Sequence, residues 1–265
     1  MRQPTFYIPH GAGPCFFMDW KMGPADTWDR TAAWLRGMVS SLPERPRALL
    51  VISAHWEASR PTVNTAEQPR LLFDYGGFPA HTYQLTWPAP GDRVLAARVA
   101  ELLAAAGLPA AEEETRGLDH GVFVPLKVAV PEADIPTVQL SLVRSLDPAL
   151  HLALGRALQP LRDEGVLIIG SGLSYHDFGG FFSEQGARTS ETFDRWLEEA
   201  VAEGEEARAA ALTGWTRAPA GRASHPREEH LLPLMVAAGA AGPDAGRVVF
   251  RDRVLGVVIS AVRFG

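Results

Sequence analysis

Histidine is the residue type in this chain whose number and placement point to chemistry. The eight histidines are His10, His55, His81, His120, His151, His176, His225 and His230. Imidazole is the commonest metal ligand in proteins and titrates near neutral pH, so a cluster of histidines suits metal binding or proton transfer. Which use applies depends on which histidines the fold brings together.

Three of the histidines each follow a short apolar run of the length of a buried strand. They are His10, His55 and His176, and the runs cover residues 5–8, 48–53 and 166–170. In open α/β sheets, ligands bind in the crevice beyond the carboxyl ends of the strands. The placement therefore predicts a shared site, although a single histidine after a strand is more often a hydrogen-bonded structural residue.

Two more histidines bracket the segment His225-Pro-Arg-Glu-Glu-His230. A proline suits the first position of a helix, and we expect a helix over residues 226–238 with His225 at its N-cap. Five residues along a helix turn the chain about 140° beyond one full turn, so His225 and His230 cannot chelate one ion together. One is then a candidate ligand and the other a neighbouring or substrate contact. Glu229 is a candidate carboxylate ligand beside His230.

The other histidines give weaker signals. His120 lies in the loop sequence Leu118-Asp-His-Gly121, before an apolar run, and is a candidate acid or base. His81 lies in a Pro- and Gly-rich loop, where we expect a structural role. We expect His151 on the exposed face of a helix and Cys15 in packing or in a pocket wall.

A site made of neutral histidines, with or without one carboxylate, suits Zn(II) or Fe(II). Two histidines and a carboxylate with open positions are typical of non-heme Fe(II) oxygenases. Three histidines with an open position are typical of hydrolytic or hydrating zinc sites. The residue types alone leave both arrangements open.

The elements that position these residues alternate between short apolar runs and longer amphipathic ones. Further strands are predicted over residues 135–142, 248–251 and 256–262, and helices over residues 25–42, 92–106, 148–164 and 190–211. Such alternation predicts an α/β fold with a central, mainly parallel sheet flanked by helices. We expect residues 1–265 to form one domain, with residues 213–223 as its most flexible loop.

Composition excludes several classes of function. Of the 265 residues, 46% are hydrophobic and 21% charged, and the net charge is −6 without any basic run, which argues against binding nucleic acid. The single cysteine excludes an internal disulfide. No apolar stretch is long enough to span a membrane, and the N-terminus lacks the apolar region of a signal peptide. We therefore expect a cytoplasmic protein that handles small molecules.

Seven segments together resemble one family. In chain order they are Ile8–Pro14, Val51–Trp56, Phe73–Pro79 with Trp87–Gly91, Leu118–Gly121, Asp134–Ser141, Gly170–Gly172 with His176, and Pro226–Pro233. Each segment alone is a weak signal. Their order and their spread over most of the chain resemble the DODA-type extradiol aromatic ring-opening dioxygenases, which are the LigB-like, class III extradiol family.

The resemblance implies a LigB-like α/β domain that opens a catechol-type ring, DOPA-like or related, with O2 to a muconic semialdehyde-type product. It implies one divalent metal per chain, Fe(II) for activity or Zn(II) as found in recombinant preparations. The family includes monomers and small oligomers, so a homo-oligomer fits the resemblance.

The resemblance also implies roles for individual residues. The metal-site histidines correspond to His10, His55, His176 and His230. In the wider superfamily the third ligand is a glutamate, for which Glu229 is the alternative here, and the counterpart of His176 is a base beside the metal.

The remaining roles follow from the same comparison. A metal lowers the pKa of a catechol hydroxyl, and His176 or His120 would take the second proton. His225 is given a supporting role beside the substrate, and Phe78 and Tyr83 are expected in the pocket wall.

Two other interpretations come from different classes. A Memo-like protein with a related histidine site would bind metal without oxygenase activity. A zinc-dependent hydrolase would work without O2, so a requirement for O2 separates it from the dioxygenase.

Overall fold

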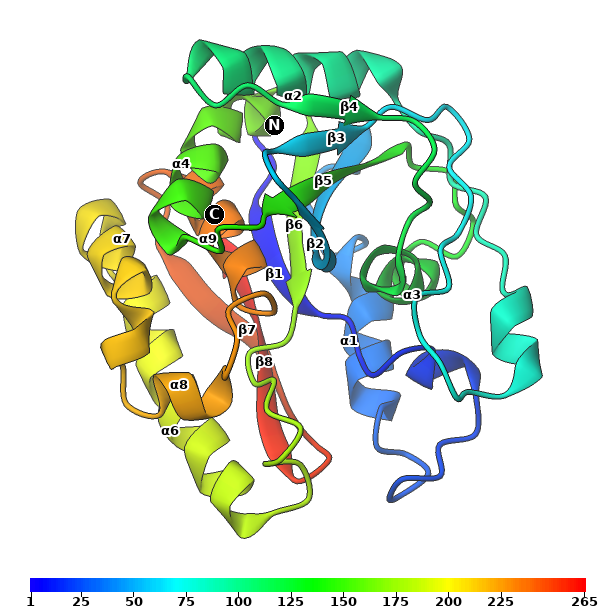
Figure 1. Ribbon diagram of the computed structural model, residues 1–265, viewed down its shortest axis with the longest axis vertical. Coiled ribbons are helices and arrows are strands. Elements are labelled where there is room, and N and C mark those ends of the chain that lie inside the picture. Colours follow the sequence, from blue (N-terminus) through cyan, green and yellow to red (C-terminus); the bar gives the residue numbers. More distant parts are fainter.

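The computed structural model describes residues 1–265 and contains one eight-stranded sheet with helices on both faces (Figure 1). The strands are β1 Thr5–Pro9, β2 Ala48–Ala58, β3 Thr62–Asn64, β4 Ala111–Glu113, β5 Thr137–Val143, β6 Val166–Gly172, β7 Gly246–Val254 and β8 Val257–Phe264. The α-helices are α1 Asp29–Met38, α2 Arg93–Ala105, α3 His120–Ala129, α4 Pro148–Leu158, α5 Pro160–Asp163, α6 Glu184–Ala202, α7 Glu205–Thr213, α8 Gly221–Ser224 and α9 Leu232–Ala241. Three 3-10 turns are η1 Cys15–Phe17, η2 Ala80–Gln84 and η3 Trp215–Arg217.

The strand order is β4-β3-β5-β2-β6-β1-β8-β7. The four central strands, β5, β2, β6 and β1, are parallel to one another, whereas β3 pairs antiparallel with β5, and β8 and β7 extend the sheet antiparallel beyond β1. This confirms the predicted α/β fold with a mainly parallel sheet. Because β6 pairs with both β1 and β2, the carboxyl ends of these three strands lie side by side.

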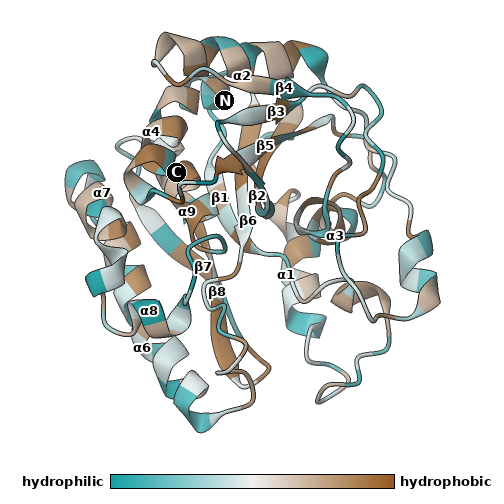
Figure 2. Cartoon of the chain, in the orientation of Figure 1, coloured by the Kyte–Doolittle hydropathy of each residue, from teal (hydrophilic) through white to brown (hydrophobic).

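Two apolar layers cover the sheet, one on each face. Alternate residues of β6 divide between them: Val166 and Ile168 pack with α4 and α9, and Leu167 and Ile169 pack with α1 and α3. Figure 2 shows the apolar colouring concentrated in the central strands and α9, with polar residues along the outer sides of α6 and α7. Burial on both faces explains the continuous apolar runs of the central strands.

Several predicted boundaries are wrong in an informative way. The predicted helix over residues 190–211 is two helices, α6 and α7, which separate at Glu203 and Gly204. The helix expected over residues 226–238 begins only at Leu232, and His225 is the C-cap of α8 rather than an N-cap. The expected flexible loop 213–223 contains η3 and most of α8, with Trp215 buried.

His151 is buried, which corrects the expectation that it lies on a helix surface. The backbone N–H of Val143 donates to His151 Nε2 at 3.0 Å, and His151 Nδ1 donates to the Asp147 carbonyl at 2.7 Å. The imidazole therefore joins the start of α4 to the end of β5. Separately, no helix of the structure has the length and apolar character needed to cross a membrane.

Candidate metal centre

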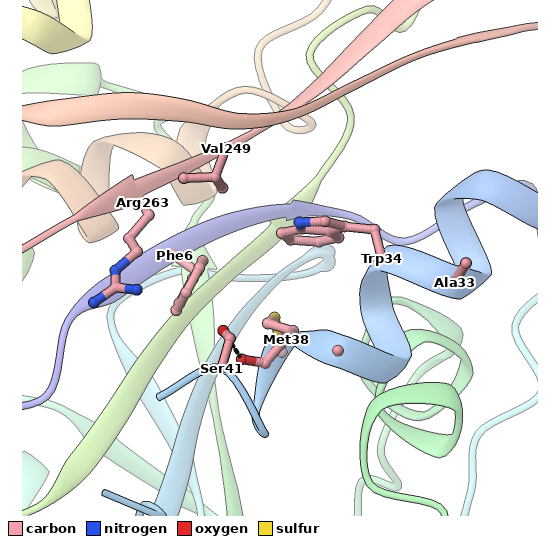
Figure 3. A pocket seen from close by; sticks show the side chains of 8 residues that line it. Phe6, Ala33, Trp34, Met38, Ser41, Val249 and Arg263 are labelled. Atoms are coloured by element: carbon pink, nitrogen blue, oxygen red, sulfur yellow. Dashed lines mark hydrogen bonds between the residues drawn. The ribbon is translucent and has the colours of Figure 1, made fainter. Parts of the chain in front are cut away.

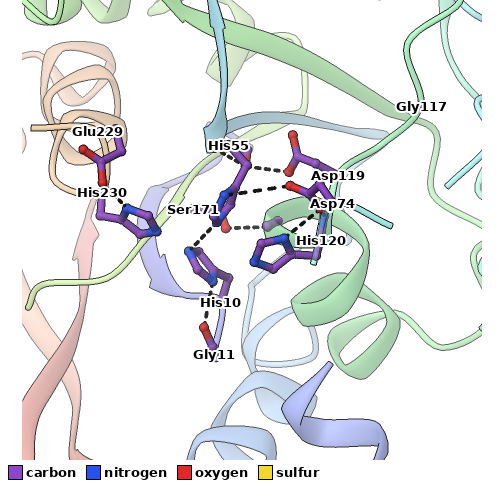
Figure 4. Close-up of polar contacts among 12 residues, drawn as sticks. His10, Gly11, His55, Asp74, Gly117, Asp119, His120, Ser171, Glu229 and His230 are labelled. Carbon is purple, nitrogen blue, oxygen red and sulfur yellow. Dashed lines mark hydrogen bonds and ion pairs between the residues drawn. The ribbon is translucent and has the colours of Figure 1, made fainter. Parts of the chain in front are cut away.

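The site lies at the edge of the sheet where β1, β6 and β2 end, as the sequence predicted. His10 directly follows β1, His55 lies in the last part of β2, and His176 follows β6 by four residues. His230 enters from the segment that precedes α9, and His120 is the first residue of α3. Figure 4 shows His10, His55, His120 and His230 pointing toward one another.

His10, His55 and His230 form a compact group of nitrogen donors. One ring nitrogen from each lies within 4.8 Å of the other two, and His10 Nε2 and His55 Nε2 are 3.3 Å apart. His230 Nε2 is buried and has no hydrogen-bond partner in the protein. A buried nitrogen left without a partner is costly, and a metal ion shared by the three rings would satisfy it. Neutral imidazoles are ligands that suit Fe(II) and Zn(II), so these residues fit the implied metal.

The outer nitrogens of His10 and His230 are held by neighbouring acceptors. His10 Nδ1 donates to the Gly11 carbonyl at 2.9 Å, and His230 Nδ1 donates to Glu229 Oε1 at 2.8 Å. His55 Nδ1 lies 3.8 Å from Asp74 Oδ2. Such partners fix the tautomer and orient the ring, and they leave the Nε2 atoms of His10 and His230 as lone-pair donors.

Burial sets the charge state of this group. Desolvation lowers the pKa of His10 and of His55 well below the usual value, and the neighbouring histidines lower both further. Burial also lowers the pKa of His230 to about 4. The three rings are therefore neutral near pH 7, and neutral imidazole is the form that binds a metal.

Glu229 lies behind the three-histidine group and connects His230 to His176. Its Oε1 is 2.8 Å from His230 Nδ1 and 3.3 Å from His176 Nδ1, while its Oε2 is 3.2 Å from Arg227 Nη1. Burial raises the pKa of Glu229, but the hydrogen bonds from His176 and His230 outweigh it and hold the pKa far below the usual range. The carboxylate is thus ionised and already paired with His230, His176 and Arg227.

His176 is close to the group without being part of it. Its ring stacks on that of His230, with centroids 3.3 Å apart and planes inclined by 16°. It shares a potential ligand group only with Glu229 and His230. The stacked ring and the bond to Glu229 suit a residue that exchanges protons beside the metal.

His120 approaches from the opposite side, with its ring centroid 3.9 Å from that of His55 and 5.3 Å from that of His10. Both its backbone N–H and its Nδ1 donate to Asp74 Oδ1, at 2.9 and 2.8 Å. Asp74 lies in the segment Phe73–Pro79, one of the seven that resemble the family, but was not among the predicted site residues. The feature of the sequence that could have identified it is that Asp74 is the single acidic residue in an aromatic and Gly-rich loop.

A buried polar network fixes the start of α3 to the end of β2. Asp119 accepts hydrogen bonds from Ser53 Oγ at 2.6 Å and Gln139 Nε2 at 2.5 Å. Arg116 pairs with Asp119 at 3.1 Å and also donates to the His55 carbonyl at 3.0 Å. The network ties the backbone of His55 to the residue that precedes His120, so it holds the relative position of the two rings.

A pocket of about 450 Å³ opens onto the histidines. Its polar lining consists of His10, His55, Asp74, His120, His176 and His230. Phe78 lines it as predicted, whereas Tyr83 does not and lies behind Tyr75, with ring centroids 5.2 Å apart. His225 does not line it either: its Nε2 bonds to the Ser174 carbonyl at 3.0 Å, and its ring packs on Phe193.

Another hollow, of about 320 Å³, lies between α1 and the antiparallel edge of the sheet (Figure 3). Its lining includes Phe6, Trp34, Met38, Val249 and Arg263, but no histidine, cysteine or carboxylate. It therefore offers neither metal ligands nor an acid–base pair.

Comparison with known proteins gives a family match over almost the whole chain. The family model for the catalytic LigB subunit of aromatic ring-opening dioxygenase matches residues 4–262. The chain is 42% identical over 244 residues to a 4,5-DOPA dioxygenase extradiol of Beta vulgaris, which covers 91% of this chain and 88% of that protein. It is 34% identical over 245 residues to a protein of that name from Escherichia coli K12, covering 90% of this chain and 85% of that one.

A solved structure shares the fold. The crystal structure of the uncharacterized protein JW3007 from Escherichia coli K12 matches with a TM-score of 0.79 and 28% sequence identity, over 100% of both chains. The predicted family resemblance and the predicted fold are therefore both confirmed.

Proposed function

This chain belongs to the LigB family of aromatic ring-opening dioxygenases, and from that premise we propose that it opens a DOPA-like catechol at a divalent metal held by His10, His55 and His230. The enzyme class follows from the family: it is a metal-dependent extradiol ring-cleavage dioxygenase, an oxidoreductase that incorporates both atoms of O2. The observation that carries the proposed ligand set is the convergence of the three ring nitrogens, with His230 Nε2 buried and otherwise unpartnered.

The choice of His230 over Glu229 as third ligand rests on their contacts. Glu229 already binds two imidazoles and the Arg227 guanidinium, and it shares no donor group with His10 and His55. Its role in the proposal is to orient His230 and to stabilise a positive charge on His176.

We propose Fe(II) as the ion for activity, because zinc has no redox chemistry to offer O2, although the same donors suit zinc. When bound, the ion lowers the pKa of the catechol hydroxyls and supplies the electron transfer with O2.

The proton transfers fall to two histidines of the chain. His176 Nδ1 lies 3.3 Å from Glu229 Oε1, so a proton held on Nδ1 leaves Nε2 free to accept a proton from a catechol hydroxyl. His120 donates Nδ1 to Asp74, and its Nε2 is then free to hold or return a proton on the other side of the ring. Tyr75 and Phe78 line the same pocket and would shield the bound ring from water.

The test is oxygen uptake by anaerobically Fe(II)-reconstituted protein across a panel of catechols, with a Zn(II)-loaded control. We expect uptake together with a yellow semialdehyde absorbance, and neither with zinc. Stoichiometric metal without uptake for any catechol would contradict the proposal and would fit a Memo-like metal-binding protein. Turnover of another substrate without O2 would fit a zinc-dependent hydrolase.

We propose in addition that residues 1–265 act as one catalytic domain, which the family match over residues 4–262 supports. The cytoplasmic location and the homo-oligomer stay predictions.

A further inference from the structure

Two segments that carry histidines of the site are bonded to each other. One follows β6 and the other precedes α9. The backbone N–H of Leu173 donates to the His230 carbonyl at 3.3 Å, and the backbone N–H of His176 donates to the Ser224 carbonyl at 2.8 Å. The pairing brings the imidazole of His176 onto that of His230, with ring centroids 3.3 Å apart. The position of His176 therefore depends on how these two segments are held.

A buried side chain adds a third bond between the segments. His225 Nε2 donates to the carbonyl of Ser174, which lies two residues before His176, at 3.0 Å. Resting on the proton transfer proposed above for His176, we propose that His225 is a positioning residue, which places the His176 imidazole beside Glu229 by holding the Ser174 carbonyl. His225 then acts on the reaction without touching metal or substrate.

The surroundings of His225 give its imidazole no other use. The ring is fully buried and packs against Phe193 and Trp215, with centroids 5.3 and 5.9 Å away. Its Nδ1 is buried without a hydrogen-bond partner, which is costly. An apolar ring would fill the same space without that cost. The bond to Ser174 is the one side-chain contact of His225 that an apolar residue could not make.

The place of His225 in the fold excludes a direct part in the chemistry. It does not line the pocket, and it belongs to none of the groups of side chains whose donor atoms lie close enough to share an ion. Burial lowers the pKa of His225 to about 3, so the ring stays neutral near pH 7. The supporting role beside the substrate that the resemblance implied therefore does not fit, whereas a role behind His176 does.

Ser174 is anchored on a second side as well. Its Oγ accepts a hydrogen bond from the backbone N–H of Ser260 in β8 at 2.8 Å, and Ser260 Oγ in turn donates to Asp194 of α6. The side chain of Ser174 is thus tied to the sheet, and its carbonyl is tied to His225. Without the donor from His225, this buried carbonyl loses its side-chain partner, and the backbone that leads to His176 is held by one bond fewer.

Two substitutions of His225 should distinguish the effect of its hydrogen bond from the effect of its size. His225→Phe keeps a ring of similar size and removes the donor, whereas His225→Gln places an amide N–H within reach of the Ser174 carbonyl. At matched iron content, we expect kcat of His225→Phe to fall about 10- to 100-fold, with a smaller effect on KM, because a small misplacement of a reacting group has an effect of that size. We expect His225→Gln to recover most of the loss. His225→Leu is a second donor-free variant, for use if the phenylalanine variant does not fold.

Thr5→Val is the matched control. Thr5 is buried at the start of β1, at the other end of the strand from His10, and its Oγ1 donates to the Ala237 carbonyl at 2.8 Å. Loss of this buried bond from a side chain to a carbonyl should lower the free energy of unfolding, as it should in His225→Phe, but leave kcat at the wild-type value. A His225→Phe variant that behaves like Thr5→Val overturns the inference.

The position of His176 is the readout that does not depend on turnover. Crystal structures of the Zn(II)-loaded variants give the distance from His176 Nδ1 to Glu229 Oε1, which is 3.3 Å in the wild type. We expect the His176 ring to move away from Glu229 in His225→Phe and to keep its place in His225→Gln. A ring that stays in place in His225→Phe overturns the inference, whatever the turnover, and so does an equal displacement in both variants.

The two readouts separate this inference from the proposed function. A His176 ring that moves in His225→Phe, with no oxygen uptake even by the Fe(II)-loaded wild type, supports the positioning of His176 and contradicts ring opening. Oxygen uptake by the wild type, together with an unmoved His176 ring in His225→Phe, supports ring opening and overturns the inference.

Discussion

Asp74 holds His120 by two hydrogen bonds to one oxygen: Oδ1 lies 2.9 Å from the His120 backbone nitrogen and 2.8 Å from its Nδ1. The other oxygen, Oδ2, lies 3.8 Å from Nδ1 of His55. One carboxylate from the loop after β3 therefore orients a proposed proton carrier and lies beside a proposed metal ligand. This makes Asp74 a positioning residue for His120.

Two substitutions of Asp74 should distinguish the effect of its hydrogen bonds to His120 from the effect of its negative charge. In Asp74→Asn the side-chain oxygen can still accept both bonds from His120, whereas Asp74→Ala removes them. We expect the alanine variant to lose about 10²-fold in kcat, because a misplaced proton-transfer group costs that much, and the asparagine variant to lose clearly less. The measurement is kcat and KM by oxygen uptake at matched iron content. Equal losses in both variants would show that orientation is not what Asp74 provides.

Metal content should distinguish a ligand from a base. His230→Ala removes one of the three converging donors, so the purified and reconstituted variant should hold little metal. His176→Ala should keep stoichiometric metal and lose about 10²- to 10⁴-fold in turnover, as expected when a general acid–base group is removed. Elemental analysis and oxygen uptake on the same samples provide the test, with the exposed His81→Ala as control. Loss of metal from His176→Ala would place His176 among the ligands.

Glu229 should act on the metal through His230. In Glu229→Gln the carboxylate that accepts from His230 Nδ1 becomes a neutral amide, so His230 becomes a weaker donor. We expect metal affinity to fall about 10- to 100-fold, the usual effect of changing such a partner. A Zn(II) titration against a competing chelator measures it. The neighbouring Glu228→Gln is the control, because Glu228 pairs with Arg222 instead, and equal affinities for the two variants would contradict the role.

The histidines at the strand ends were predictable because their elements are simple. The apolar runs before His10, His55 and His176 are long enough for buried strands and too short for most helices. Once β6 pairs with β1 and β2 in parallel, the three carboxyl ends have to meet at one edge. The sequence could not give this strand order, so the family resemblance was needed to join the three positions.

The misplaced helix start has a tertiary cause. The His230 carbonyl accepts a hydrogen bond from Tyr7 Oη at 2.7 Å and another from the Leu173 backbone at 3.3 Å. It also packs so closely on Gly172 that a Cβ there would lie 2.1 Å from this oxygen. Contacts from β1 and β6 thus hold the chain at His230 in a turn before α9. The helix propensities of residues 226–230 cannot predict these contacts, because they come from strands far away in the sequence.

Asp74 was missed for a similar reason. Its partner His120 is 46 residues away in the sequence, and Asp74 lies in a loop without regular structure. Periodicity finds the faces of strands and helices but gives no signal for a loop acid that pairs across such a distance. The burial of His151 could not be predicted for the same reason, because the ring is held by a hydrogen bond from the backbone N–H of Val143 in β5.

His151, which does not line the histidine pocket, should make the folded state sensitive to acid. Its Nε2 accepts the Val143 N–H, so protonation of the folded protein would break that bond, and burial lowers its pKa below the value of 6.5 for an exposed histidine. The unfolded chain therefore binds this proton first. The contribution to the free energy of unfolding is complete above about pH 6.5 and is lost as the pH falls toward the lower, folded-state pKa, by up to about 1.4 kcal/mol per pH unit.

The variant His151→Gln tests this contribution, because glutamine offers an oxygen to the Val143 N–H and does not ionise. Its free energy of unfolding should depend less steeply on pH between 6.5 and 5 than that of the wild type, whatever its stability at pH 7.5. Urea denaturation at several pH values measures both slopes. The other buried histidines contribute equally to the two proteins, so the difference in slope reports on His151 alone. If the free energy of unfolding depends on pH equally in the wild type and in His151→Gln, His151 is not the neutral acceptor of the Val143 N–H.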